Sequence, residues 1–206
     1  MTIELVVFDC DGVLFRSERA NIAFYNEVLR LAGEPPLDDW GLAACHALSS
    51  AQLFERYYGD RPEHLARLRR IAQEIDYSPF YPLMEPQENL REVLGNVRRR
   101  YRTAMATNRG KTTRGVLDYF GLWPFFELAV GVADVPRPKP HPDMLLKCLE
   151  HFGVTSEQAV YVGDQVSDAE AAHAAGLRFI AVGSVNAASD ACIDALSDLE
   201  SALSRL

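Results

Sequence analysis

Carboxylates follow two short apolar runs that lie far apart in this 206-residue chain, Asp9 with Asp11 near the start and Asp164 with Asp168 near the end. Carboxylates held close together raise one another's pKa and repel an anionic substrate unless a cation lies between them. Mg²⁺ prefers such hard oxygen ligands and commonly binds through one or two carboxylates, phosphate oxygens and waters. The pattern therefore predicts a Mg²⁺ site formed by Asp9, the carbonyl of Asp11, Asp164 and Asp168.

Asp9 and Asp11 also have the residue types that phosphoryl transfer needs. A carboxylate such as Asp9 can attack phosphorus to form an aspartyl-phosphate, which splits a difficult displacement into two easier steps. Asp11 lies two residues further on and can protonate the leaving oxygen, then accept a proton from the attacking water. Taken alone, Asp9-x-Asp11-Gly12 is equally compatible with an Asx-type turn that closes a strand. The remaining polar residues favour catalysis.

Thr107 and Asn108 end another apolar run and are candidate phosphate-binding residues. The Thr107 hydroxyl can donate a hydrogen bond to a phosphoryl oxygen, and Asn108 is expected to assist. The backbone amides that follow are expected to open a helix and to add oriented donors and a favourable dipole. Arg109 comes next and, like Arg16, can add positive charge near a substrate, but a solvated arginine at the start of that helix is the expected state.

Lys139 lies between two prolines in the sequence PRPKPHP. Proline restricts its own backbone and that of the residue before it, so this segment should be stiff and extended. Such a segment can aim one ammonium group inward. We expect Lys139 to keep Asp9 ionised and to offset the charge of a bound phosphate.

Strand-like and helix-like segments alternate along most of the chain, with short loops between them. Strands are expected at 5–8, 102–106, 127–130, 159–162 and 179–182, and helices at 90–97, 112–120, 142–152, 167–176 and from 197 onward. Parallel strands need a crossover connection, usually a helix, so this order predicts an α/β doubly wound parallel sheet with helices on both faces. Ligands gather at the carboxyl ends of such strands, where Asp9, Thr107 and Asp164 are expected.

Residues 16–81 interrupt this alternation with mostly helical patterning. Ile22, Tyr25 and Leu29 share one helical face, and Leu65 and Leu68 belong to another. We therefore expect a helical cap domain at 16–81 inserted into an α/β core domain made of 1–15 and 82–206.

Composition excludes several classes of function. The formal charge of −8 argues against general binding to nucleic acid, which requires a basic face, but it is compatible with a small anionic partner. No window approaches the roughly 20 apolar residues of a membrane span, and no signal sequence precedes Asp9, so we expect a cytoplasmic protein. Four cysteines without paired spacing are expected to be buried free thiols. No heptad seam indicates an oligomeric state.

With these residues in place, the chain resembles the haloacid dehalogenase (HAD) superfamily. The similarity covers essentially the whole length of the chain. Within the superfamily, the chain resembles the phosphoglycolate phosphatase and beta-phosphoglucomutase-like branch, whose members have a Rossmann-like core and a helical cap. The resemblance implies a Mg²⁺-dependent phosphatase that acts on a small phosphorylated metabolite. It also implies the site roles, which are nucleophile for Asp9, acid/base for Asp11, phosphate binding for Thr107, the family lysine for Lys139, and metal binding for Asp164 with Asp168.

Two residues depart from the pattern of this branch. Arg16 stands where an acidic residue is common and is a candidate substrate contact, and Gln165 stands where Ser or Thr is common.

Asp11 disfavours a dehalogenase, since those members lack an acid/base aspartate there. A phosphomutase that returns the phosphoryl group to a sugar is the alternative enzyme. A receiver-like signalling domain or a non-catalytic member of the same fold is the alternative from another class.

Overall fold

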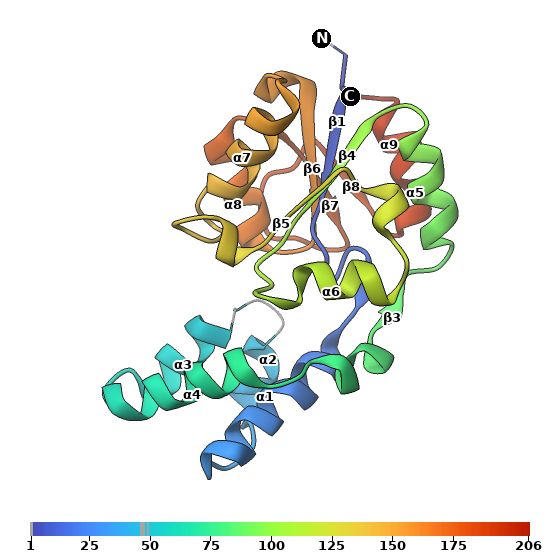
Figure 1. Cartoon of the computed structure of the whole chain (residues 1–206). Helices are drawn as coiled ribbons and strands as arrows, with labels where there is room; N and C mark the ends of the chain where they lie inside the picture. Colours follow the sequence, from blue (N-terminus) through green and yellow to red (C-terminus); the bar gives the residue numbers. More distant parts are fainter. Residues whose placement is uncertain (1, 46–47, 49) are drawn as a thin grey trace. The chain divides into compact units, whose positions relative to one another are not determined.

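The computed structural model describes residues 2–45, 48 and 50–206, which form two compact units. The core unit joins the chain up to Phe15 to Pro86–Leu206, and the helical unit is Arg16–Glu85 (Figure 1). The sequence predicts an insertion that ends at residue 81, whereas the helical unit continues to Glu85. The additional residues complete a 3₁₀ helix, η1 (Ser78–Leu83), and lead into the short strand β3 (Glu85–Pro86).

The core unit is built on a parallel sheet. Within the described residues, its six strands have the order β5-β4-β1-β6-β7-β8. The strands are β1 (Leu5–Phe8), β4 (Arg102–Ala106), β5 (Leu128–Val130), β6 (Ala159–Gly163), β7 (Arg178–Val182) and β8 (Ala191–Ile193). All neighbours in this sheet are parallel. The predicted α/β class and doubly wound parallel sheet are therefore confirmed.

The first strand, β1, lies at the point where the strand order reverses. The chain adds β4 and β5 on one side of β1, then crosses over to add β6, β7 and β8 on the other side. Leu5 pairs with both Arg102 and Ala159, so three neighbouring strands begin and end almost level. A crevice outside the carboxyl ends of the strands at such a reversal is the usual place for a ligand in this class of fold.

Helices cover both faces of the sheet (Figure 1). One face carries α7 (Asp143–Phe152) and α8 (Val166–Ala175), and the other carries α5 (Leu90–Arg98) and α9 (Leu199–Leu203). The remaining helical segments of this unit are α6 (Thr112–Tyr119), η2 (Trp123–Phe125), η3 (Val132–Asp134), η4 (Ser156–Gln158) and η5 (Leu196–Asp198). Strand β1 is fully buried along its length, as expected for a strand covered on both faces.

The helical unit has a core of its own. Its helices are α1 (Glu18–Ala32), α2 (Asp39–Ala44), α3 (Ser50–Tyr58) and α4 (Pro62–Glu74), followed by η1. Tyr25 and Leu29 of α1 pack in one buried cluster with Leu65 and Leu68 of α4, and Ile22 packs against it. The predicted apolar faces of these two helices therefore bury together. Helix α1 ends at Gly33, whose left-handed backbone caps it.

Several short elements lie outside what the sequence predicts. Strand β2 (Phe15–Arg16) pairs with β3 in a separate two-stranded sheet, where the chain enters and leaves the helical insertion. Strand β8 (Ala191–Ile193) is only three residues long, which is too short for the sequence pattern to mark it. Of the four cysteines, Cys10, Cys45 and Cys148 are buried free thiols as expected, but Cys192 on β8 is exposed. Among the residues described, no helix combines the length and apolar composition needed to cross a bilayer.

Two adjacent leucines of α7 offer a matched test of this packing. Leu145 is completely buried in the core cluster, whereas Leu146 is 46% exposed. Removing a fully buried leucine side chain leaves a cavity, so Leu145→Ala should lower the free energy of unfolding by about 2–5 kcal/mol. Leu146→Ala, the same substitution on the same helix, should change it by no more than about 0.5 kcal/mol. Urea unfolding measures both, and equal losses would contradict the described placement of α7.

Candidate active site

The predicted site residues of the core unit meet at one edge of the sheet. Asp9 follows β1, Thr107 follows β4 and Asp164 follows β6, and these three strands are neighbours. Hydrogen bonds tie the ends of the strands together, since the Asp9 amide donates to the carbonyl of Val162 and the Thr107 amide to that of Val130. The topology therefore places side chains from three distant parts of the sequence beside one another.

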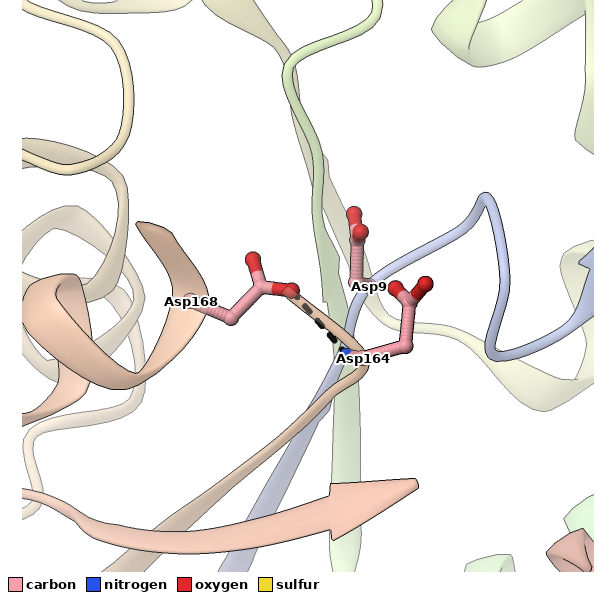
Figure 2. Close-up of side chains that lie close together, drawn as sticks. All are labelled: Asp9, Asp164 and Asp168. Atoms are coloured by element: carbon pink, nitrogen blue, oxygen red, sulfur yellow. Dashed lines mark hydrogen bonds between the residues drawn. The ribbon is translucent and has the colours of Figure 1, made fainter. Parts of the chain in front are cut away.

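Asp9, Asp164 and Asp168 form a candidate metal site. Each offers one carboxylate oxygen, and these oxygens all lie within 4.8 Å of one another. Figure 2 shows the three side chains converging from the ends of two strands and from the start of α8. Oδ1 of Asp164 is buried and makes no hydrogen bond to any described residue. A buried carboxylate oxygen without a donor is costly, and a hard divalent cation such as Mg²⁺ fits the group.

The turn after Asp11 depends on a glycine. Gly12 has a φ of +78°, in the left-handed region that favours glycine. A Cβ atom at this position would lie 2.0 Å from Oδ2 of Asp164, so no larger residue fits. Gly12 therefore lets the loop that carries Asp11 pass directly against the Asp164 carboxylate.

Asp168 is completely buried and anchors its surroundings. Its Oδ2 accepts hydrogen bonds from the backbone amides of Asp164 at 3.1 Å (dashed line in Figure 2) and Gln165 at 3.0 Å. Its Oδ1 accepts a hydrogen bond of 2.6 Å from Nζ of Lys139 and lies 3.2 Å from the hydroxyl of Tyr161. Both oxygens of Asp168 thus have protein partners, and the residue orients both the Asp164 loop and Lys139.

Lys139 points inward, as its sequence context predicts. Its Nζ lies 2.9 Å from Oδ1 of Asp9 and 2.8 Å from the hydroxyl of Tyr161, and the residue is 3% exposed. Its backbone is held by Asn108, whose side chain accepts from the Lys139 amide at 3.0 Å and donates to the Lys139 carbonyl at 3.1 Å. Asn108 is expected from the sequence to assist in substrate binding, but its amide group instead holds the lysine loop in place.

Tyr161 is a site residue that the sequence analysis missed. It lies in the middle of β6, where every residue is buried, and its hydroxyl donates to the carbonyl of Ala106 at 2.9 Å. The same hydroxyl accepts from Lys139. The signal that could have found it is a single polar atom in an otherwise apolar strand, because buried hydroxyls are nearly always hydrogen-bonded.

Thr107 is almost completely buried, and its surroundings differ from the prediction. Helix α6 begins at Thr112, so the residues that follow Thr107 form a loop and do not open the helix directly. The Thr107 hydroxyl accepts a 3.3 Å hydrogen bond from the amide of Arg109. The expectation that the amides directly after Thr107 open the helix is therefore wrong, because these amides belong to the loop before α6.

Arg109 also departs from the prediction of a solvated side chain. It is only 8% exposed and donates two hydrogen bonds to the carboxylate of Asp11. Its Nε lies 2.8 Å from Oδ2 of Asp11, and its Nη2 lies 2.6 Å from Oδ1. Such a planar, bidentate pair is the strongest form of an arginine–carboxylate contact. The candidate acid/base residue therefore has a cationic partner that no spacing in the sequence indicates.

The two residues that depart from the family pattern lie in different units. Gln165 donates from Nε2 to Oδ2 of Asp164 at 2.7 Å, so it helps to orient a candidate metal ligand. Arg16 belongs to the helical unit, where its exposed side chain lies 3.5 Å from Oε2 of Glu85.

Burial dominates the electrostatics of the site. Burial raises the pKa of Asp9 to about 8; Lys139 opposes this rise, whereas Asp168, Asp164 and Asp11 add to it. Burial and the charge of Asp168 likewise raise the pKa of Asp164 to about 7. Lys139 therefore favours the ionised form of Asp9, as predicted, but does not by itself outweigh desolvation. A further positive charge is needed to ionise the group at neutral pH.

Lys139 itself remains charged. Burial disfavours its charged form, but the neighbouring carboxylates of Asp168 and Asp9 outweigh burial and raise its pKa. Cys10, next to the candidate nucleophile, behaves differently, because burial raises the pKa of its thiol well above the usual value. The thiol is therefore protonated near neutral pH, which agrees with a packing role.

The hydroxyl of Tyr161 offers a test of this network. Tyr161→Phe leaves the Ala106 carbonyl without this donor and removes one acceptor from Lys139, so the free energy of unfolding should fall by about 1–3 kcal/mol. Tyr119→Phe, at a position that is 53% exposed, is the matched control and should change it by less than about 0.5 kcal/mol. Urea unfolding measures both variants. A Tyr161→Phe protein as stable as its control would contradict the described network.

The raised pKa values of Asp9 and Asp164 predict how stability depends on pH and on Mg²⁺. Because both values lie above those of the unfolded chain, the metal-free protein should lose stability as pH rises from about 4 through 7 and 8. Mg²⁺ binds the ionised carboxylates, so the rise in Tm that it causes should be larger at pH 8.5 than at pH 6.

Thermal unfolding at the two pH values, with Mg²⁺ and with a chelator, measures this difference. Asp164→Asn serves as the control, since it removes one ionisable ligand and should abolish most of the Mg²⁺ effect. A Mg²⁺-induced rise in Tm that is equal at both pH values, or that persists in Asp164→Asn, would contradict the assignment of this cluster as a metal site.

Comparison with known proteins agrees with this arrangement. Residues 6–182 match the family of haloacid dehalogenase-like hydrolases. A phosphoglycolate phosphatase from Nitrosococcus oceani is 27% identical over 98% of this chain and 97% of its own length. One from Pseudomonas putida is 31% identical over 85% of this chain and 68% of its own length.

A solved structure supports the same grouping. The crystal structure of a HAD-superfamily hydrolase of subfamily IA, variant 1, from Geobacter sulfurreducens has a TM-score of 0.78 and 32% sequence identity to this chain. The match covers 98% of this chain and 96% of that one. The chain therefore belongs to the haloacid dehalogenase-like hydrolase family, as an enzyme of its phosphatase branch.

Proposed function

We propose that this enzyme is a Mg²⁺-dependent phosphatase that hydrolyses a small phosphomonoester through an aspartyl-phosphate on Asp9. The observation that carries the proposal is the buried meeting of Asp9 with Lys139 and with the Asp164 and Asp168 carboxylates at one edge of the sheet. A nucleophilic carboxylate beside a fixed ammonium and a candidate metal site is the arrangement that phosphoryl transfer requires.

In the first step, a carboxylate oxygen of Asp9 attacks phosphorus. The new bond joins Asp9 to phosphorus while the bond from phosphorus to the ester oxygen breaks, and Asp11 transfers a proton to that leaving oxygen. In the second step a water oxygen attacks the phosphorus of the aspartyl-phosphate, the bond between Asp9 and phosphorus breaks, and Asp11 takes one proton from the water. Inorganic phosphate leaves, and Asp9 and Asp11 return to their starting states.

The phosphoryl group needs positive charge and hydrogen-bond donors around its oxygens. Lys139, held by Asn108, Tyr161 and Asp168, would supply a fixed ammonium, and Thr107 would donate its hydroxyl. Asp9 and Asp164 would hold Mg²⁺, with the Asp11 carbonyl as a further ligand and Asp168 behind them. When bound, Mg²⁺ would neutralise the acidic cluster and the phosphoryl oxygens.

Phosphoglycolate is the first substrate to test, because relatives that cover most of this chain carry the name phosphoglycolate phosphatase. Small sugar phosphates and nucleotides are the comparison substrates. Arg16 remains a proposed substrate contact, through the positive charge that it adds at the start of the helical unit.

Phosphate release from a panel of these esters, with Mg²⁺ and with a chelator, tests the proposal. Asp9→Asn removes the nucleophile and should abolish release, while Asp11→Ala should slow it by about 100-fold to 10,000-fold, the usual contribution of a general acid. Asp198→Asn, at an exposed position before α9, is the matched control and should keep the parent rate. Mass spectrometry of the quenched parent should detect one added phosphoryl group on Asp9.

Two outcomes would contradict the proposal. Release by Asp9→Asn at the parent rate would exclude an aspartyl-phosphate on this residue. A phosphoenzyme that forms on Asp9 but yields a phosphorylated sugar, with no free phosphate, would move the assignment to a phosphomutase.

A further inference from the structure

The ion pair between Arg109 and Asp11 lies within the core unit and is bidentate. Both carboxylate oxygens of Asp11 accept from the guanidinium, at 2.8 and 2.6 Å, and the arginine side chain is 6% exposed. The Asp11 side chain is more open, at 21%. The arginine is therefore the more buried member of the pair, and the aspartate lies on its more open side.

The backbone of Arg109 is fixed on both sides. Its amide donates to the Thr107 hydroxyl at 3.3 Å, and its carbonyl accepts from the Val132 amide at 3.0 Å and from the Thr113 hydroxyl at 3.1 Å. A Cβ atom on Gly131 would lie 2.8 Å from that carbonyl, so the approach depends on glycine there. These contacts hold Arg109 at one position, next to the acid/base residue.

This pair conflicts with the role of Asp11 in catalysis. To act on the leaving oxygen, Asp11 must turn at least one carboxylate oxygen toward it, but both oxygens are turned toward Arg109. The pair must therefore open during the reaction. Opening the pair gives up two hydrogen bonds between charged groups, which is unfavourable unless another anion takes them over.

We propose that Arg109 is a specificity-determining residue that binds a second anionic group, carried by the leaving group of the substrate, and thereby releases Asp11. The inference rests on the proposed phosphatase function and names its substrate class, which is a phosphomonoester whose leaving group bears a carboxylate or a second phosphate.

The division of charge in the site supports this assignment. Lys139 and the acidic cluster lie around Asp9, where the transferred phosphoryl group would bind. Arg109 instead lies beside Asp11, the residue that faces the leaving oxygen. A planar guanidinium matches a carboxylate or phosphate bidentately, so an anion on the leaving group can take over both hydrogen bonds that Asp11 gives up.

Three esters separate this role from others. Phosphoglycolate carries a carboxylate, 2-hydroxyethyl phosphate has a neutral hydroxymethyl group in its place, and p-nitrophenyl phosphate has a leaving group that needs no protonation. The variants are Arg109→Gln, which removes the charge, and Arg109→Lys, which keeps the charge but not the planar fork. The control is Arg102→Gln, which breaks a bidentate pair with Glu127 at the opposite end of β4.

The parent should prefer phosphoglycolate over 2-hydroxyethyl phosphate by at least about 100-fold in kcat/KM, because only the first gives Arg109 a new partner. In Arg109→Gln this preference should fall below about tenfold, through a rise in KM for phosphoglycolate with little change in kcat. Activity on p-nitrophenyl phosphate should stay within about threefold of the parent. Arg109→Lys should be intermediate, and Arg102→Gln should match the parent.

The alternatives give different results. If Arg109 served only to position Asp11, Arg109→Gln would lower kcat on all three esters at an unchanged Tm, because Asp11 also acts on the water in the second step, and this would overturn the proposal. An equal loss on all three esters, with a lowered Tm, would assign Arg109 a structural role and also overturn it; an Arg109→Lys protein that folds keeps this comparison possible. A parent that hydrolyses the esters without preference refutes this inference alone, whereas one that hydrolyses none refutes the proposed phosphatase function as well.

Discussion

The desolvation of like charges is the constraint on which the active site depends. Asp9, Asp164 and Asp168 are held together where water cannot solvate them, and burial raises the pKa of the first two. One ammonium, from Lys139, compensates only part of this charge. The site therefore favours a divalent cation, and we propose that this cation in turn allows an anionic phosphoryl group to bind beside the carboxylates. The same buried carboxylates therefore lower the stability of the ligand-free protein and favour the binding of a cation.

A second group of residues acts on the site only through other residues. Asn108 clamps the backbone of Lys139, Tyr161 and Asp168 fix its ammonium, and Gln165 orients Asp164. The contacts of Asn108, Tyr161 and Asp168 with Lys139 join segments that are distant in the sequence, whereas Gln165 is the neighbour of Asp164. The geometry of the site is consequently a property of the sheet edge as a whole, because the ends of β1, β4 and β6 must stay level for these bonds to form.

The sequence predicts most of the scaffold and the chemical groups, because short apolar runs followed by carboxylates leave few alternatives. Asp9, Thr107 and Asp164 could be placed at one edge because each follows an apolar run at the end of an expected strand. Arg109, Tyr161 and the clamping role of Asn108 could not, because they depend on contacts between residues that are distant in the sequence. The start of α6 at Thr112 agrees with the predicted helix at 112–120. Strand β8 has only three residues, which is too short to leave a pattern.

The way the chain leaves and re-enters the core has a consequence for how this enzyme can diversify. It departs after Phe15 and returns at Pro86, so the acidic cluster, Lys139 and the Asp11–Arg109 pair are all encoded outside the inserted segment. The helical unit also has its own buried core, centred on residues such as Tyr25 and Leu68. Selection can therefore rewrite, lengthen or exchange that segment without altering the residues that perform the chemistry. The residues proposed for the chemistry and the inserted helices are thus encoded in separate parts of the sequence.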